Sequence, residues 1–116
     1  MHEYPLTERI VDIAVKTARE HGASRVSAVH LVIGETSGII PDSVQMYFDL
    51  IAEETPAGGA KLIIRQIKPE MHCPECNTNF VRPRFSFACP VCGTLGSPTA
   101  IGREFYVESI ELETND

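Results

Sequence analysis

Hydrophobic positions along the chain show helical spacing in two stretches. Between Pro5 and about His21 apolar residues recur every three or four positions, and Gly22 follows as a helix stop. A second helix is predicted from Pro41, because the missing N–H of proline costs nothing at the first helical position. The apolar stripes of the two helices are Leu6, Ile10, Ile13, Ala14 and Ala18, and then Val44, Tyr47, Phe48 and Ile51.

Three other stretches have the pattern of strands. Residues 25–33 ("RVSAVHLVI") are apolar on both faces of the pleat, which predicts a central strand. Residues 61–68 ("KLIIRQIK") and 103–113 ("REFYVESIELE") are predicted as two more. In the last stretch Phe105 and Val107 are out of phase with Ile110 and Leu112, so a phase slip near Glu108 predicts a bulge or cover on both faces.

Residues 70–98 differ in composition, being rich in Pro, Cys and Asn. A segment of this length buries too little apolar surface to fold without a metal or disulfides. The order of elements predicts an α+β fold, in which two helices pack on a small β-sheet and a zinc-ribbon-like module is inserted before the last strand. The expected domains are 1–69 plus 99–116, and the module at 70–98.

The module contains the motifs C-P-E-C and C-P-V-C-G, whose ligands are Cys73, Cys76, Cys89 and Cys92. Two C-x-x-C turns can surround one tetrahedral ion with four thiolates, and Gly93 can supply a positive φ after the second turn. Disulfides and redox dithiols are the alternatives, and iron in a rubredoxin-like site competes with zinc. A closed four-sulfur site leaves no open coordination position, so the expected role of the zinc is structural.

Composition narrows the function classes. The chain has 116 residues and a net charge of −6, which weakens a nucleic-acid function because phosphate binding needs clustered basic residues. Arg82 and Arg84 do interleave with aromatic residues, but the favoured interpretation is that Phe80, Phe85 and Phe87 cover the zinc site. The sequence shows no signal peptide and no apolar run of roughly 18 residues, so a cytoplasmic protein without a membrane span is expected.

The first residues, "MHEYPL", offer a second metal site. The amine of Met1, the amide nitrogen of His2 and the His2 imidazole can close two fused chelate rings, and Glu3 can add an oxygen. Such nitrogen donors favour square-planar Ni(II) or Cu(II) over zinc. The alternative is a frayed tail without chemistry. The helix that follows limits the freedom of the tail and so reduces the entropy lost on binding.

Together, "MHEYPL", "VIGE" at 32–35 and "CPEC…CPVCG" before an acidic last strand make the chain resemble the HypA family of nickel metallochaperones. The resemblance covers essentially the whole chain. It implies transient Ni(II) at Met1, His2 and Glu3, structural zinc at the four cysteines, and no enzymatic activity. It also implies delivery of nickel to the [NiFe]-hydrogenase large-subunit precursor with a HypB-like GTPase, and in some bacteria a role in urease maturation.

Several points stay open at the level of sequence. Further nickel ligands could come from Glu35, Asp42 or His72, whereas His30 is expected to be a core residue. The chain could be a monomer or a homodimer, and the recipient of the metal is not specified. The competing functions are a zinc-ribbon module that binds protein or nucleic acid, and a rubredoxin-like electron carrier.

Overall fold

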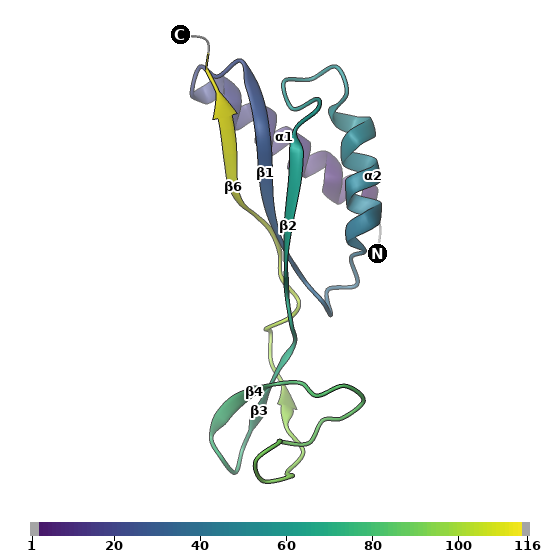
Figure 1. Ribbon diagram of the computed structural model, residues 1–116, viewed down its shortest axis with the longest axis vertical. Helices are drawn as coiled ribbons and strands as arrows, with labels where there is room; N and C mark the ends of the chain where they lie inside the picture. The colour runs from purple at the N-terminus through teal and green to yellow at the C-terminus, as the bar shows by residue number, and fades with distance from the viewer. Residues whose placement is uncertain (1–2, 115–116) are drawn as a thin grey trace.

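The computed structural model describes residues 3–114, which form an elongated α+β molecule of 58 × 27 × 16 Å. Two helices and a three-stranded sheet occupy one end of the long axis, and a smaller three-stranded sheet occupies the other (Figure 1). The α+β prediction is confirmed. The elements in chain order are α1 (Glu3–Glu20), β1 (Arg25–Gly34), α2 (Pro41–Ala52), β2 (Lys61–Ile67), β3 (Glu70–Cys73), β4 (Thr78–Val81), β5 (Ser97–Pro98) and β6 (Phe105–Glu113).

Helix α1 begins two residues before the predicted start at Pro5. Proline is tolerated there because the N–H groups of a first helical turn have no partner within the helix. The buried Thr7 hydroxyl donates a hydrogen bond of 2.6 Å to the Glu3 carbonyl, so this buried polar group has a partner. Helix α2 begins at Pro41, as the sequence predicts.

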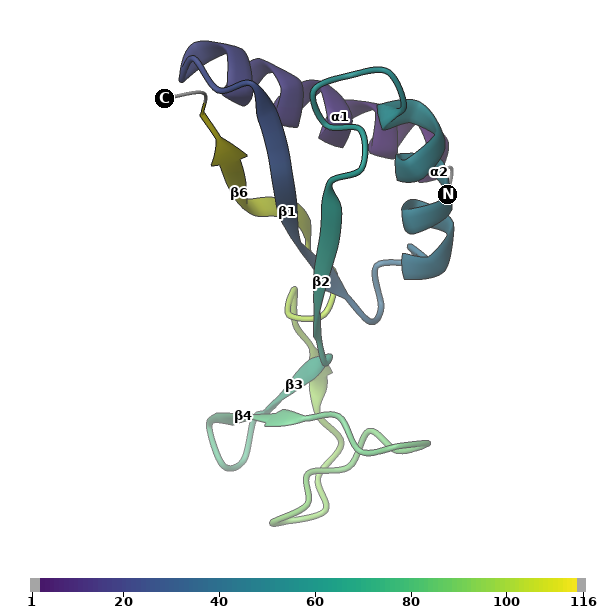
Figure 2. The same cartoon turned by 45° about the horizontal axis from the view of Figure 1, so that its top comes forward.

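The larger sheet has the order β2-β1-β6, with β1 and β2 parallel and β6 antiparallel to β1. The predicted central position of β1 is therefore confirmed. Helix α1 crosses behind this sheet and α2 packs against α1 (Figure 2). The core lies between the helices and the sheet. It contains buried side chains from α1, β1 and α2, among them Ile10, Ala14, Val29, Leu31, Ile33, Val44 and Phe48.

A bulge in β6 explains the phase slip in its sequence. His30 of β1 pairs with Ser109, and the next residue, Leu31, pairs with Val107, so Glu108 has no partner of its own. The extra residue inverts the alternation of side chains, because faces alternate with a period of two. Both apolar pairs consequently pack against the one core (Phe105, Val107, Ile110 and Leu112). The bulge prediction is confirmed, and cover on both faces is not needed.

His30 is not the core residue that the sequence predicted. Its side chain is 30% exposed, and Nε2 lies 2.6 Å from the Glu111 carboxylate. The reason is the sheet geometry: His30 alternates with Val29 and Leu31, which point toward the helices, so its side chain lies on the opposite face.

The smaller sheet has the order β4-β3-β5 and lies within residues 70–98. The chain reaches it from β2 and leaves it toward β6, so two segments cross at the junction between the sheets (Figure 1). There the backbones of Gly34 and Gly102 meet, and a Cβ on Gly34 would lie 2.1 Å from the carbonyl carbon of Gly102. The Thr36 N–H and hydroxyl both donate to the Gly102 carbonyl, each at 2.8 Å.

Candidate metal centres

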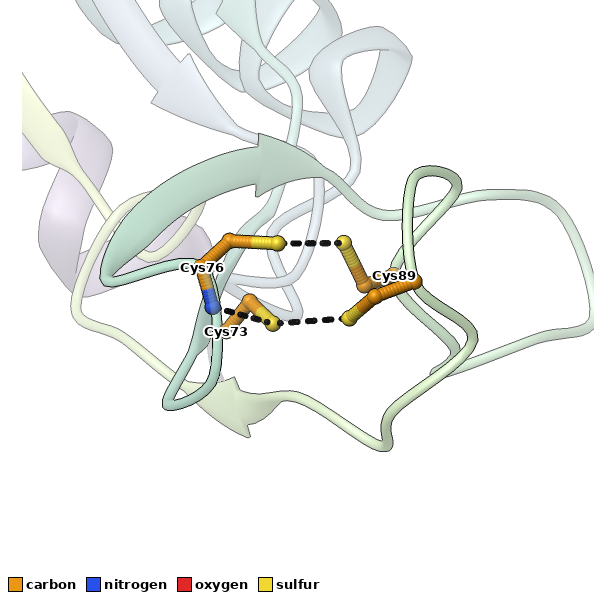
Figure 3. A group of neighbouring side chains, drawn as sticks. Cys73, Cys76 and Cys89 are labelled. Carbon is orange, nitrogen blue, oxygen red and sulfur yellow. Dashed lines mark hydrogen bonds between the residues drawn. The ribbon is translucent and has the colours of Figure 1, made fainter.

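The four cysteines predicted to bind zinc come together in the smaller module. Their sulfurs all lie within 4.8 Å of one another, with Cys73 3.5 Å from Cys92 and Cys76 3.9 Å from Cys89 (Figure 3). Four sulfurs at about 2.3 Å from one ion are about 3.8 Å apart in a tetrahedron. The arrangement therefore fits a four-thiolate metal site. It does not fit disulfides, whose sulfurs lie about 2.05 Å apart.

Each cysteine pair lies in a turn with the same backbone geometry. Asn77 donates its N–H to the Cys73 carbonyl at 2.8 Å, and Gly93 donates to the Cys89 carbonyl at 2.8 Å. Both donors have positive φ, 54° for Asn77 and 78° for Gly93, which closes the turn and leaves the two sulfurs of each pair on one side. The role of Gly93 was predicted from sequence; that of Asn77 was missed, although Asn is the residue after Gly that best tolerates this conformation.

The electrostatics of the cluster favour a cation. A hydrogen bond from Thr94 lowers the pKa of Cys92 to about 6, which favours the thiolate form of this sulfur in the folded module. Hydrogen bonding with Cys92 and then Cys73 raises the pKa of Cys76 to about 12, because a thiol that shares its hydrogen with neighbouring sulfurs loses it reluctantly. A divalent ion removes this conflict by stabilising every thiolate at once.

At the other predicted site, Met1 and His2 lie outside the described residues. Glu3 is the first described residue and opens α1. Two contacts fix this first turn: the Thr7 bond to the Glu3 carbonyl, and an edge-to-face contact of the Tyr4 and Tyr47 rings, whose centroids are 5.3 Å apart. The start of α1 is thus held against α2, a contact that helical periodicity alone did not predict.

The other candidate nickel ligands are dispersed. Asp42 lies in the first turn of α2, and Glu35 follows β1 at the junction between the sheets. His72 lies in β3, where its Nδ1 is 3.0 Å from the Asn79 side-chain oxygen. Within residues 3–114, the cysteines form the one group of three or more His, Cys, Asp or Glu side chains with ligand atoms close enough for an ion.

A family model described as hydrogenase/urease nickel incorporation, metallochaperone, HypA, matches residues 1–112. The chain belongs to the HypA family. Among curated relatives, a protein of Caldanaerobacter subterraneus named hydrogenase maturation factor HypA is 42% identical, over 97% of this chain and all of the relative. Proteins of the same name from Chloroflexus aurantiacus and Dehalococcoides mccartyi are 40% and 37% identical, over 98% and 97% of this chain and 99% and 95% of theirs.

Solved structures of the HypA family share the fold. The solution structure of the nickel metallochaperone HypA from Helicobacter pylori aligns with a TM-score of 0.67, covering 99% of this chain and all of that one at 24% identity. A second solution structure of a HypA protein gives a TM-score of 0.73, covering 99% of this chain and 98% of that chain, also at 24% identity. The recognition of a HypA-like α+β protein from its motifs is confirmed.

Neither helix within residues 3–114 of this HypA-family chain has the length and hydropathy that a membrane crossing requires.

The expected cover of the zinc site by three phenylalanines is wrong for two of them. Phe80 is half-buried and packs over Gly96, whereas Phe85 and Phe87 are 89% and 52% exposed. Phe85 instead lines a hollow with Lys68 and Pro69, and Phe87 lines another with Met71 and Pro98, so neither hollow includes a cysteine.

Proposed function

We propose that this chain binds Ni(II) through Met1, His2 and Glu3 and delivers it during the maturation of a [NiFe]-hydrogenase. The observation that carries the proposal is the family match over residues 1–112 together with the sequence Met-His-Glu at the chain start. Urease, which the family description also names, is a second class of recipient.

Zinc is the structural ion in this proposal, held by Cys73, Cys76, Cys89 and Cys92. The sulfur spacing supports a closed tetrahedral site, and bound zinc contributes free energy that the small sheet lacks. The chain then works as two modules, residues 1–69 plus 99–116 for nickel and residues 70–98 for zinc. Iron in the cysteine site would instead support the rubredoxin-like function, and its visible absorbance distinguishes the two.

The proposed delivery depends on a site that both holds and releases its ion. An amine, an amide and an imidazole at a chain end can close around Ni(II) and open again without unfolding the core. Protons compete for the same nitrogen lone pairs, so nickel affinity falls as the pH drops. A micromolar Kd, about −8 kcal/mol, suits retention and transfer.

The chain's proposed partners are a HypB-like GTPase and the hydrogenase large-subunit precursor. The sequence contains no G-x-x-x-x-G-K-[ST] phosphate-binding loop, so the nucleotide hydrolysis that accompanies delivery belongs to the partner. The names of the relatives, which refer to hydrogenase maturation, support this assignment.

The test is a nickel titration by calorimetry on the tag-free, zinc-loaded chain with its native Met1. We expect one exchangeable nickel, and a loss of affinity of at least about 100-fold in His2→Ala, since the imidazole and its chelate ring are both removed. His21→Ala is the matched control, because His21 lies at the exposed end of α1 and its Nδ1 already bonds the Thr17 carbonyl at 2.9 Å.

A second variant separates the amine from the imidazole. Three extra glycines before Met1 convert the free amine at that position into an amide and move the new amine too far from His2 to share its chelate rings, and we expect them to weaken nickel binding as strongly as His2→Ala. Unchanged affinity in either variant would remove the N-terminal site from the proposal, whatever the zinc content.

A further inference from the structure

In the part of the chain that the structure describes, a groove at the junction between the two sheets is lined by none of the four cysteines and by none of the residues proposed to bind nickel at the chain start. It has a volume of about 470 Å³ and is lined by Lys68 before β3 and by Arg82, Arg84 and Phe85 after β4. A smaller hollow of about 170 Å³ shares Arg82 and adds Phe87 and Arg103. The loop after β4 projects sideways from the small module in both views (Figures 1 and 2). We call these six residues the junction surface.

One of the two aromatic rings of this surface, that of Phe85, is exposed at a cost to the fold. Phe85 is 89% exposed and has a φ of 61°, a left-handed conformation that disfavours side chains with a Cβ. A glycine would adopt this turn more easily, and the exposed ring gains little from burial. Backbone strain of this kind is found at functional surfaces, where the side chain itself is needed.

Each ring carries a guanidinium group on one face. Arg84 lies over Phe85 at 5.1 Å from the ring centroid, and Arg82 lies over Phe87 at 4.7 Å. The Nε of Arg82 is buried without a hydrogen-bond partner and is closed to a ligand, so the terminal nitrogens of the two guanidinium groups are the donors that a ligand would meet. The four ion pairs found within residues 3–114 involve other cations: Lys16, Arg25, His30 and Arg65. The stacked guanidinium groups are therefore held in place while donors remain available to a ligand.

The charge of the junction differs from that of the whole chain. Four cations, Lys68, Arg82, Arg84 and Arg103, lie there with two carboxylates, Glu35 and Glu70. A third carboxylate, Glu104, accepts a hydrogen bond from the Gly102 N–H at 2.8 Å, so the local balance is +1, whereas the chain has a net charge of −6. Such a patch attracts a short anionic segment, while the acidic remainder of the molecule repels a long polyanion.

We propose that the junction surface binds an acidic segment of a partner protein, one that carries apolar side chains between its carboxylates. Carboxylates would pair with the edges of the guanidinium groups of Arg82 and Arg84, and apolar side chains would cover the exposed rings. Single-stranded nucleic acid fits less well, because the guanidinium groups already occupy one face of each ring and base stacking needs open faces. The proposal does not depend on nickel binding.

The test uses the full zinc-loaded chain and a fluorescein-labelled peptide of alternating Glu and Leu, followed by fluorescence anisotropy. We expect saturable binding that Arg84→Ser combined with Phe85→Gly weakens at least about tenfold, the equivalent of about 1.4 kcal/mol. Arg19→Ser removes an exposed arginine at the end of α1 and serves as the charge control, with an expected change below about twofold. On titration with the peptide, NMR amide shifts should move at 68 and 82–88.

Phe85→Gly alone distinguishes a binding role from a structural one. Glycine adopts a φ of 61° without strain, so the melting temperature of the Phe85→Gly variant should equal or exceed that of the unmodified chain. Its binding of the peptide should weaken. A lower melting temperature would assign the ring to the fold and overturn the proposal. Tighter binding of an oligothymidine than of the peptide, equal binding of a Lys-Leu peptide, or affinity unchanged in the double variant would each overturn it as well. Nickel affinity should be the same in all these variants, so a failure here is separable from a failure of the N-terminal site.

Discussion

Gly34 tests the close crossing that joins the two sheets. In Gly34→Ala the new Cβ would lie 2.1 Å from both the carbonyl carbon and the oxygen of Gly102, and 2.6 Å from the backbone nitrogen of Arg103. All three neighbours are backbone atoms, which cannot rotate away as a flexible side chain would. The segment at 102–103 must therefore move by more than an ångström if the variant is to fold.

The magnitude follows from the hydrogen bonds that hold this crossing. They are Gly34 N–H to the Glu104 carbonyl at 2.7 Å, and Thr36 N–H and hydroxyl to the Gly102 carbonyl at 2.8 Å each. At about 1 kcal/mol for each bond, displacement of the segment costs about 3 kcal/mol of unfolding free energy. Overpacking strain of about 1–3 kcal/mol adds to this where the segment moves incompletely.

Urea unfolding of the zinc-loaded chain measures this loss, with zinc content determined in parallel. Gly38→Ala is the matched control: Gly38 also has a positive φ, 81°, but a Cβ there meets nothing within 4 Å. We expect the control to lose about 1 kcal/mol from backbone strain alone. If Gly34→Ala is no less stable than Gly38→Ala, the crossing does not hold the sheets together and the reasoning is wrong.

Two further predictions concern the metal sites. Tyr47→Ala should weaken nickel binding about 2- to 10-fold in calorimetry, because it removes a ring contact of about 0.5–1.5 kcal/mol that fixes the first turn of α1, whereas Tyr47→Phe should leave it unchanged. Removal of zinc by a chelator should abolish hydrogen-exchange protection at 70–73 while the amides of β1 stay protected, and loss of both together would contradict the division into two modules.

The larger sheet and the helix α1 that packs on it could be predicted, because the spacing of hydrophobic residues in their sequences agrees with the faces that are buried. The stripe of α1 has the helical period, and the continuous apolar run of β1 matches its central position. The cysteine site was predictable for a related reason: two residues between each pair fix the local turn, so Cys73 and Cys76 face one way without reference to the rest of the chain.

Features that depend on distant segments could not be predicted in the same way. The exposure of Phe85 depends on where the loop after β4 leads, and an aromatic residue beside a metal site is equally compatible with cover. The outward position of His30 depends on which face of β1 the helices cover, and neither face is distinguished by polarity in "RVSAVHLVI". The β6 bulge was readable only because two apolar pairs fell out of phase within one strand.

The junction explains one motif whose role the sequence could not assign. "VIGE" at 32–35 contributes to the resemblance to the HypA family, yet Gly34 lies at neither proposed metal site. Because Gly34 has no side chain, the segment that returns from the small module can cross closely against the end of β1. There the Gly102 carbonyl accepts hydrogen bonds from Thr36. The orientation of the small module is set there, because both segments that connect it to the larger sheet pass through this point. The motif therefore belongs to the connection between the two modules, and a substitution at Gly34 should alter their relative orientation before it alters either ligand set.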